Sequence, residues 1–452
     1  MPVVTDLERL SKPELIALVY EQQRRIVSLE QEVQRLTERL HPPRRPPSRL
    51  AALVHRLKRP GQKAGHPGMT RVTPTHIDRV VEQRLSRCPR CQGRLGTPVA
   101  VTTHVQEDLI PARVEVTCFK RHRYYCTSCR RVVTAPPAPE EIPHSTLGPQ
   151  VLTHALLLKY VHGLPFNKIR TAFQQLATLR VSEGALAQAL QRLASWLQVE
   201  TDALRQAIRT AAATHVDETG WKLTGSNHWL WAFVTERLAY VRIDKSRGSG
   251  VPKDVLGEAY RGVVISDFHS AYNRLKGPQQ KCWVHLLREL RDCAKTELSD
   301  EYRSAHRRLR RLFHDARRLA RQRPALPSLP LQRRQHRLEA RLFAWGATPY
   351  HNTTLKRLAG RVLKHHQQLL TFTRVAGVSP DNNAAERAIR PHVIIRKRSY
   401  QSRSPTGMAT HASLTSLVQT LALQGRAIGE TLQSAYLRHR HGDPTPVVVS
   451  GS

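Results

Sequence analysis

The sequence has no long apolar run and comparatively few acidic residues, and each shortage excludes a class of protein. No stretch is apolar over the roughly 18 residues that a membrane-spanning helix needs, and we find no signal peptide. We therefore expect a cytoplasmic protein without membrane contact. Hydrophobic residues still make up 40% of the chain, which is enough to build buried cores.

Positive charge is in large excess. The 452 residues include 72 Lys+Arg against 35 Asp+Glu, which gives a formal net charge of +37. Such an excess is the electrostatic footprint of a polyanion-binding protein and favours nucleic acid as the partner. The alternative is an arginine-rich composition of ribosomal type or of a high-GC genome. The length predicts roughly two to four domains.

Residues 1–40 are expected to form an N-terminal helix with a heptad seam. Apolar side chains recur at the four-three spacing of a coiled coil, interrupted by one glutamine. The seam comprises Leu15, Val19, Gln22, Ile26, Leu29, Val33, Leu36 and Leu40. It predicts self-association as a homodimer or higher oligomer, and a single amphipathic helix packed on its own chain is the alternative.

Residues 41–77 contain no acidic residue and are rich in proline and glycine. This composition predicts a flexible basic linker. Its charge can lie along DNA phosphates, or the segment can be a solvated spacer without a binding role.

Four of the seven cysteines form two CxxC pairs, Cys88-Pro-Arg-Cys91 and Cys126-Thr-Ser-Cys129. Outside a secreted context, such pairs indicate metal binding rather than disulfides. Four thiolates suit a closed tetrahedral Zn²⁺ site with a structural role. Residues 78–140 are therefore expected to form a zinc-ribbon-like module, with a β-hairpin between the two pairs.

The remaining three cysteines lack the spacing of metal ligands. Cys118 lies in the alternating segment Val114–Phe119 and is expected to be a buried or strand residue. Cys282 and Cys293 are expected to be core residues.

Residues 141–205 are predicted to form a helical domain. A break at Gly163-Leu-Pro165 separates the helices, and Ser182 is placed to cap the next one. Several short helices in a basic chain permit a helix-turn-helix, but an ordinary helical domain is favoured.

From about residue 206 the pattern changes to alternating apolar segments. The predicted strands are Thr214–Leu223, His228–Thr235, Ala239–Ile243 and Gly262–Ser266, with a helix at Pro252–Tyr260 and a further candidate strand at Gln280–His285. Three strands, a helix and a buried strand that ends in aspartate match the order of a ribonuclease-H-like α/β core. The predicted fold class is therefore multidomain α+β, with this core preceded by the coiled coil, the zinc module and the helical domain.

The catalytic domain is expected to span residues 206–400, with an arginine-rich helical insertion at about 286–370 that is broken at Pro324–Pro330. The insertion is either a phosphate-contacting arm or a solvated helical hairpin. Residues 401–452 are predicted to contain a helix near Ala409–Leu423 and a disordered tail from His439.

Three acidic residues have settings that suit a catalytic metal site. Asp217 lies in His-Val-Asp-Glu-Thr, Asp267 follows Val-Val-Ile-Ser, and Glu386 lies in Asn-Asn-Ala-Ala-Glu-Arg. Two strand-borne aspartates and a helix-borne glutamate match the needs of two-metal phosphoryl transfer, in which the metals sit about 3.5–4 Å apart. A strand-end aspartate by itself is more often a turn or cap residue, so the prediction depends on all three together.

Two neighbours leave alternatives open. Glu218 competes with Asp217 for the first position, but on a strand the two face opposite sides, so only one can point into the site. His285 is predicted either to contact the leaving phosphate or to satisfy a hydrogen bond at a strand end.

On the predicted final helix, Asn382, Asn383 and Arg390 lie near the face of Glu386, because their spacing from it is three or four residues. The amides can hydrogen-bond DNA or orient the carboxylate, and Arg390 can hold a phosphate with its forked donors. Arg387 points elsewhere and is a weaker candidate for DNA binding.

Together and in order, these motifs resemble the insertion-sequence-66 family of bacterial DDE transposases over nearly the full chain. The resemblance rests on the CxxC knuckles, His215-Val-Asp-Glu-Thr219, Ser266-Asp-Phe-His-Ser-Ala-Tyr272, Cys282-Trp-Val-His285 and, most clearly, Asn382-Asn-Ala-Ala-Glu-Arg-Ala-Ile-Arg-Pro391. The family usually has Gly-Tyr after the second aspartate, where this chain has Phe268-His269.

The resemblance implies a ribonuclease-H-like fold with Asp217, Asp267 and Glu386 as the catalytic triad and two Mg²⁺ or Mn²⁺ ions per site. It implies strand cleavage at the ends of an insertion sequence and attack of the freed 3′-hydroxyl on target DNA, in the bacterial nucleoid, with accessory proteins of the same element as further partners. The alternatives are an inactivated transposase kept as a DNA-binding protein and a ribonuclease-H-like nuclease that cuts without joining.

Overall fold

The computed structural model describes residues 21–30, 32, 75–97, 100–106, 113–142, 145–293 and 299–449. The chain divides into two compact units, Met1–Asp108 and Leu109–Ser452. No helix in the described ranges is long and apolar enough to cross a membrane.

In the first unit, residues 21–30 form an exposed helix. Ile26 and Leu29, two members of the predicted heptad seam, are 55% and 60% exposed. Most of the seam and of the linker 41–77 lies outside the described residues, so the coiled coil and the linker stay predictions. Further along, the Cys88 amide donates to the Gly93 carbonyl over 2.9 Å and the Gln92 amide donates to the Cys88 carbonyl over 2.8 Å. These bonds close a tight turn around the first cysteine pair.

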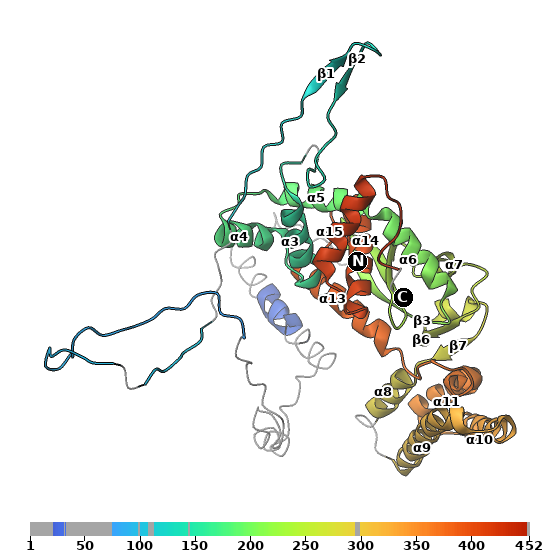
Figure 1. The fold of residues 1–452 in the computed structure, drawn as a ribbon. Helices are drawn as coiled ribbons and strands as arrows, with labels where there is room; N and C mark the ends of the chain where they lie inside the picture. Colours follow the sequence, from blue (N-terminus) through green and yellow to red (C-terminus); the bar gives the residue numbers. More distant parts are fainter. Residues whose placement is uncertain are drawn as a thin grey trace, which may run out of the picture. The chain divides into compact units, whose positions relative to one another are not determined.

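The second unit carries a two-stranded hairpin near its start (Figure 1). Strand β1 (Arg123–Cys126) pairs antiparallel with β2 (Arg131–Thr134). The prediction of a hairpin between the cysteine pairs is therefore wrong, because the hairpin encloses the second pair. Cys118 is exposed and lies outside any strand, which also contradicts its prediction. Val116 beside it is 91% exposed, so this alternating segment has no apolar surface to pack against.

A five-stranded mixed sheet forms the centre of the second unit. Its strands are β3 (Ala213–Leu223), β4 (Ser226–Val234), β5 (Ala239–Asp244), β6 (Val263–Ser266) and β7 (Gln279–Lys281). The order is β5-β4-β3-β6-β7; β3, β4 and β5 form an antiparallel meander, and β6 and β7 run parallel to β3. The four strands predicted from alternation are all present within one or two residues of their expected bounds.

The two faces of the sheet are covered by different helices. Successive side chains along a strand point to opposite faces. Val216 and Trp231 therefore belong to one apolar cluster. Helices that precede the sheet in the chain and helices that follow it supply most of the other residues of this cluster. Ala232, on the other face, packs with Ile389 of the helix that carries Glu386.

Helices before the sheet pack on the first of these faces (Figure 1). They are α3 (Pro149–Leu156), η2 (Leu157–Val161), α4 (Phe166–Ala177), α5 (Glu183–Trp196) and α6 (Gln198–Thr210), and α7 (Gly250–Leu256) follows β5. The predicted cap is confirmed, since Ser182 Oγ accepts a hydrogen bond of 3.1 Å from the Ala185 amide at the start of α5. Because these helices share one apolar core with the sheet, they support it directly.

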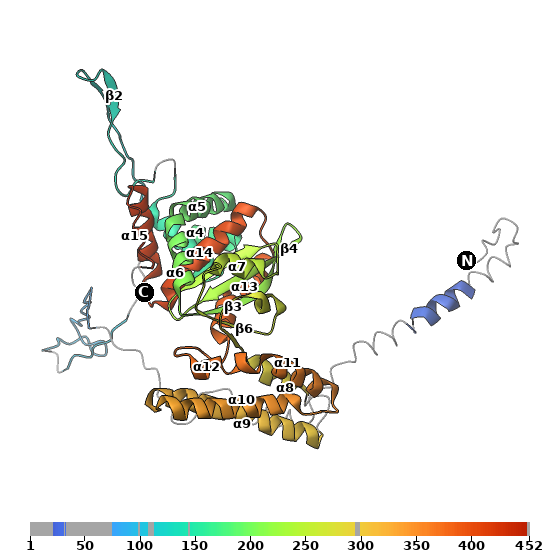
Figure 2. The same ribbon diagram turned by 90° about the vertical axis from the view of Figure 1, so that its right-hand side faces the viewer.

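A helical insertion separates β7 from the helix that carries Glu386. It contains α8 (Trp283–Cys293), α9 (Asp300–Gln322), η4 (Arg323–Ala325), α10 (Ser328–Ala347), α11 (Thr353–Leu369) and α12 (Thr371–Arg374). In Figure 2, α8 and α11 lie between the sheet and the paired helices α9 and α10. The candidate strand Gln280–His285 is only partly correct, because it ends at Lys281 and α8 begins at Trp283. Cys282 and Cys293 are buried, as predicted.

Three helices complete the unit: α13 (Asn383–Ser399), α14 (Pro405–Leu423) and α15 (Ile428–Arg440). The prediction of a disordered tail from His439 is wrong. The Glu200 carboxylate, which is fully buried, contacts His439 Nε2 at 2.9 Å and accepts hydrogen bonds of 2.8 and 2.9 Å from the Val447 and Val448 amides. A buried carboxylate needs such partners, and these bonds hold the tail against α6.

Candidate active site

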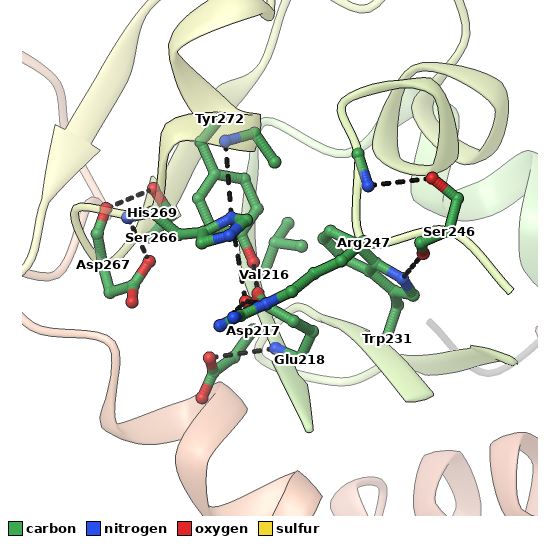
Figure 3. A network of polar contacts seen from close by, with 12 residues as sticks. Val216, Asp217, Glu218, Trp231, Ser246, Arg247, Ser266, Asp267, His269 and Tyr272 are labelled. Carbon is green, nitrogen blue, oxygen red and sulfur yellow. Dashed lines mark hydrogen bonds and ion pairs between the residues drawn. The ribbon is translucent and has the colours of Figure 1, made fainter. Parts of the chain in front are cut away.

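The three predicted carboxyl groups lie on neighbouring elements. Asp217 is in the middle of β3, Asp267 follows the last residue of β6, and Glu386 is in the first turn of α13. Strands β3 and β6 are adjacent and parallel. Asp217 pairs across the sheet with Ala232, whose side chain packs on the face covered by α13. The fold thus brings the three residues to the same face of the sheet, and Figure 3 shows how Asp217 and Asp267 lie there.

The electrostatics of Asp217 reflect this arrangement. The pKa of the Asp217 carboxyl is raised to about 7, first by burial and then by the charges of Glu218, Asp267 and Glu386, against the hydrogen bond of 2.9 Å that the Glu218 amide donates to Oδ1. Several carboxylates that share one partly dry site disfavour the charged form of each other. A site of this kind attracts a cation.

Glu386 faces two basic side chains of α8. His285 Nε2 lies 3.6 Å from Oε1, and Arg288 Nη2 lies 3.6 Å from Oε2. Glu386 Oε1 and His285 Nδ1 are buried without a hydrogen-bond partner. The strand-end alternative for His285 is therefore wrong, because the residue lies on a helix and this ring nitrogen makes no hydrogen bond.

Asn382 is a structural residue in this fold. It is fully buried, and its Nδ2 donates to the Val216 carbonyl over 2.9 Å while Oδ1 lies 3.2 Å from His215 Nδ1. Its backbone amide also donates to Cys282 Sγ over 3.2 Å. Of the two predicted roles, contact with DNA is excluded by this burial, and Asn382 instead ties the start of α13 to β3.

The other predicted DNA-binding residues of α13 are accessible. Asn383 is half-buried in the first turn, and Arg387 and Arg390 are exposed. Their role in DNA binding stays a prediction.

Glu218 lies on the opposite face of the sheet from Asp217, as predicted, and has its own set of partners (Figure 3). Its side chain is 2% exposed. The Tyr272 hydroxyl donates to Oε2, and Arg247 donates to Oε1 through Nε at 3.1 Å and Nη2 at 3.0 Å. His269 Nδ1 lies 3.8 Å from the same oxygen. Burial and the charge of Glu218 hold the pKa of Tyr272 well above its ordinary value, so this hydroxyl stays a donor.

This cluster links Glu218 to the segment that carries Asp267. The His269 amide donates to Asp267 Oδ1 over 2.8 Å, and Tyr272 lies in η3 (Ser270–Arg274) directly after it. Arg247 also lies over the ring of Trp229 at 4.2 Å, which fixes its direction. We infer that Glu218 acts as a positioning residue for the loop after β6. No sequence pattern indicated this role, because Arg247 and Tyr272 lie 29 and 54 residues further along the chain.

A buried lysine next to Asp267 was also missed. Lys281 on β7 is fully buried, and its Nζ donates to Ser266 Oγ over 3.1 Å. Burial lowers the pKa of Lys281 to about 8, although the charge of Asp267 opposes this shift. Strand β7 has only three residues, so the sequence pattern around Lys281 does not distinguish a buried lysine from an exposed lysine.

The donor set fits a divalent cation. Carboxylate oxygens are the ligands that Mg²⁺ and Mn²⁺ prefer, and Glu386 Oε1 is buried without a hydrogen-bond partner. Within the described ranges, no group of three or more His, Cys, Asp or Glu side chains is arranged to hold a metal ion as it stands. The three carboxyl groups lie at one face of the sheet, and as they stand they do not form a metal-binding group.

Each cysteine pair by itself forms a turn that favours thiolates. The pKa of the Cys88 thiol is lowered, first by the backbone amide of Cys91, and that of Cys126 is lowered first by the backbone amide of Cys129. A lowered thiol pKa is what a metal-binding knuckle requires. Zinc binding stays a prediction for both pairs.

Comparison with known proteins identifies the family. A model of the IS66 transposase family matches residues 144–410, which include Asp217, Asp267 and Glu386. Two uncharacterized proteins of Sinorhizobium fredii (strain NBRC 101917 / NGR234) are similar. The protein y4qI is 23% identical over 383 residues, which cover 77% of this chain and 70% of y4qI. The protein y4jD is 25% identical over 393 residues, which cover 78% of this chain and 75% of y4jD. The family model spans more than half of the chain, and the chain belongs to the IS66 family of transposases.

Proposed function

We propose that this transposase is a DDE enzyme that cleaves DNA strands at the ends of an insertion sequence and joins the freed 3′-hydroxyl to target DNA. The observation that carries the proposal is the position of Asp217, Asp267 and Glu386 at one face of the sheet, on β3, after β6 and on α13. The pKa of Asp217, raised to about 7 first by burial and the charge of Glu218, supports the proposal because the charges of Asp267 and Glu386 also contribute to the shift.

The sheet supports a ribonuclease-H-like core. An antiparallel meander comes first, and two parallel strands then extend the sheet beyond β3 in the order β5-β4-β3-β6-β7. The glutamate returns on a helix after the insertion, which is the order expected from the sequence. This topology places Asp217 on β3 and Asp267 directly after the adjacent strand β6.

The residues of the site have separate roles toward the metal ions and the DNA. Asp217, Asp267 and Glu386 would hold two Mg²⁺ or Mn²⁺ ions, which when bound lower the pKa of the attacking water or hydroxyl and stabilise the departing oxygen. His285 and Arg288, each 3.6 Å from Glu386, orient this carboxylate, and Arg288 presents positive charge toward a DNA phosphate. Asn382 fixes the first turn of α13, which bears Glu386, on β3.

Three further parts of the proposal concern the rest of the chain. Cys88, Cys91, Cys126 and Cys129 are proposed to bind structural Zn²⁺, because each pair forms a turn that lowers a thiol pKa. The N-terminal heptad seam is proposed to form a homodimer or higher oligomer. Arg387 and Arg390 are proposed to contact DNA, because both are exposed on the helix of Glu386.

Strand cleavage by matched variants tests the function. The substrate is a duplex that carries the terminal sequences of the element, with a second duplex as target, in Mg²⁺. We expect Asp217→Asn and Glu386→Gln to lose cleavage and joining by more than about 100-fold, because each removes a charged metal ligand. Glu258→Gln is the control, since Glu258 is 71% exposed in an ion pair with Lys276.

The products distinguish the alternatives. Cleavage without joined product would favour a nuclease, and DNA binding without cleavage by the wild-type protein would favour an inactivated transposase. Full cleavage by Asp217→Asn would contradict the proposed triad.

A further inference from the structure

A cavity lies between the end of α9 and the loop that leads to α13. Its volume is about 250 Å³. The residues from α9 and η4 are mostly arginines, and the residues from the segment before α13 have apolar side chains. The lining includes Arg317, Arg321, Arg323, Phe372, Val378 and Pro380. The cavity exceeds by several-fold the roughly 30 Å³ that one water occupies, so a hydrated phosphate group has room in it.

The charge of this cavity is entirely positive. Arg317 and Arg321 are exposed on α9, and no acidic residue lines the cavity. Arg323 is half-buried, and its Nη1 is buried without a hydrogen-bond partner. Guanidinium groups bind anionic oxygens through charge-assisted hydrogen bonds.

Nearby acids of the insertion are engaged elsewhere. Asp315 contacts Arg341 at 2.9 Å and Arg318 at 3.8 Å. Glu339 contacts Arg374 at 2.6 Å and His366 at 3.7 Å. Both acids therefore have other basic partners, and Arg317 lies over the ring of Phe313 at 5.7 Å.

The cavity is tied directly to the candidate active site. The carbonyl of Pro380, which lines the cavity, accepts a hydrogen bond of 3.0 Å from the Trp283 amide at the start of α8. The chain then passes through Asn382, which is anchored to β3, and enters the turn of α13 that bears Glu386. A ligand in the cavity is therefore held against the same loop that positions Glu386.

We propose that this cavity binds a phosphodiester group of the DNA backbone next to the strand that the carboxylates act on. The inference rests on the proposed function and assigns part of the insertion to substrate binding. Arginine forks suit phosphate oxygens, and phosphate contacts fix the register of a duplex without reading its sequence. The site is therefore expected to bind DNA of any base sequence with similar affinity.

Two triple variants with equal loss of charge test the proposal. The cavity variant carries Arg317→Gln, Arg321→Gln and Arg323→Gln. The control variant carries Arg307→Gln, Arg311→Gln and Arg333→Gln, which replace exposed arginines of α9 and α10 outside the cavity. Equilibrium binding of a short duplex is measured in EDTA over a range of salt concentrations, so that cleavage does not contribute.

We expect the cavity variant to bind at least about 10-fold more weakly than the control variant, with a salt slope reduced by about 0.9 for one lost phosphate contact. Arg321→Gln alone changes an exposed side chain and leaves folding intact. This single variant is also expected to bind DNA more weakly than the wild type. Equal affinities and slopes for the two triple variants overturn the proposal.

Inorganic phosphate separates DNA from a free anion as the ligand. If phosphate raises the melting temperature of the wild type but not of the cavity variant, while both bind DNA equally, the DNA assignment is overturned. Failure of the proposed function has a different signature, since the wild type would then bind DNA through the cavity without cleaving it.

Discussion

At the residue scale, Asp217 and Glu218 illustrate how far a sequence pattern reaches. Strand alternation predicted that the two face opposite sides of the sheet, and the sheet register bears this out. The pattern could not predict that Tyr272 and Arg247 would bind Glu218, because those contacts depend on tertiary packing. The tie between Glu218 and the loop of Asp267 therefore became visible only in the structure.

The first prediction concerns this tie. Glu218→Gln removes the charge that Arg247 and Tyr272 bind while it keeps the size of the side chain. We expect the free energy of unfolding to fall by about 1–3 kcal/mol, because hydrogen bonds to a buried charged group are lost. Chemical denaturation measures the change, and strand cleavage is expected to fall with it as the loop of Asp267 loosens. Unchanged stability and cleavage would show that Glu218 positions nothing.

The remaining errors at this scale concern Asn382 and His285. The sequence pattern contains neither the burial of Asn382 nor the helical position of His285. Asn382 proved to be buried, because its side-chain amide makes hydrogen bonds from the start of α13 to Val216 and His215 of β3. His285 proved helical because α8 begins at Trp283, directly after a strand of three residues.

At the element scale, periodicity predicted the sheet and most helices, because the apolar patterns of β3, β4 and α5 are regular. The zinc-module hairpin was misplaced, since an alternating segment forms a strand only where a partner strand and an apolar surface exist. The ordered C-terminal tail was missed because its anchor, Glu200, lies on the distant helix α6.

Two glycines of the insertion provide a matched test of helix packing. A Cβ at Gly346 of α10 would lie 2.9 Å from the Leu363 amide nitrogen of α11, whereas a Cβ at Gly360 would meet nothing within 4 Å. Gly346→Ala is expected to destabilise the protein by about 1–3 kcal/mol, because α10 and α11 must separate. Gly360→Ala is expected to stabilise it by up to about 1 kcal/mol, because alanine is the better helix former.

Urea denaturation of both variants measures this difference. Shifts of the midpoint in opposite directions support the close approach of α10 and α11. Equal shifts in one direction would mean that the helices do not touch at Gly346.

At the scale of the whole molecule, charge and fold serve the same task. The net charge of +37 predicted a polyanionic partner, and the family match to a transposase agrees with that prediction. Within the second unit, exposed arginines are frequent on α9 and α10, and acidic residues gather at the proposed site on the sheet. Composition predicted the partner, but only the fold brought Asp217, Asp267 and Glu386 to one face.

The account as a whole depends on divalent cations at these three carboxylates. Binding of Mn²⁺ to the full chain in the presence of duplex DNA, followed by electron paramagnetic resonance of the free ion, tests this most directly. Thiolate sites do not interfere, because Mn²⁺ prefers oxygen ligands. We expect about two tight Mn²⁺ ions per chain, a loss of this binding in Asp217→Asn, Asp267→Asn and Glu386→Gln, and no loss in Glu258→Gln. If Asp217→Asn binds Mn²⁺ with the number and affinity of the wild type, the proposed metal site is wrong.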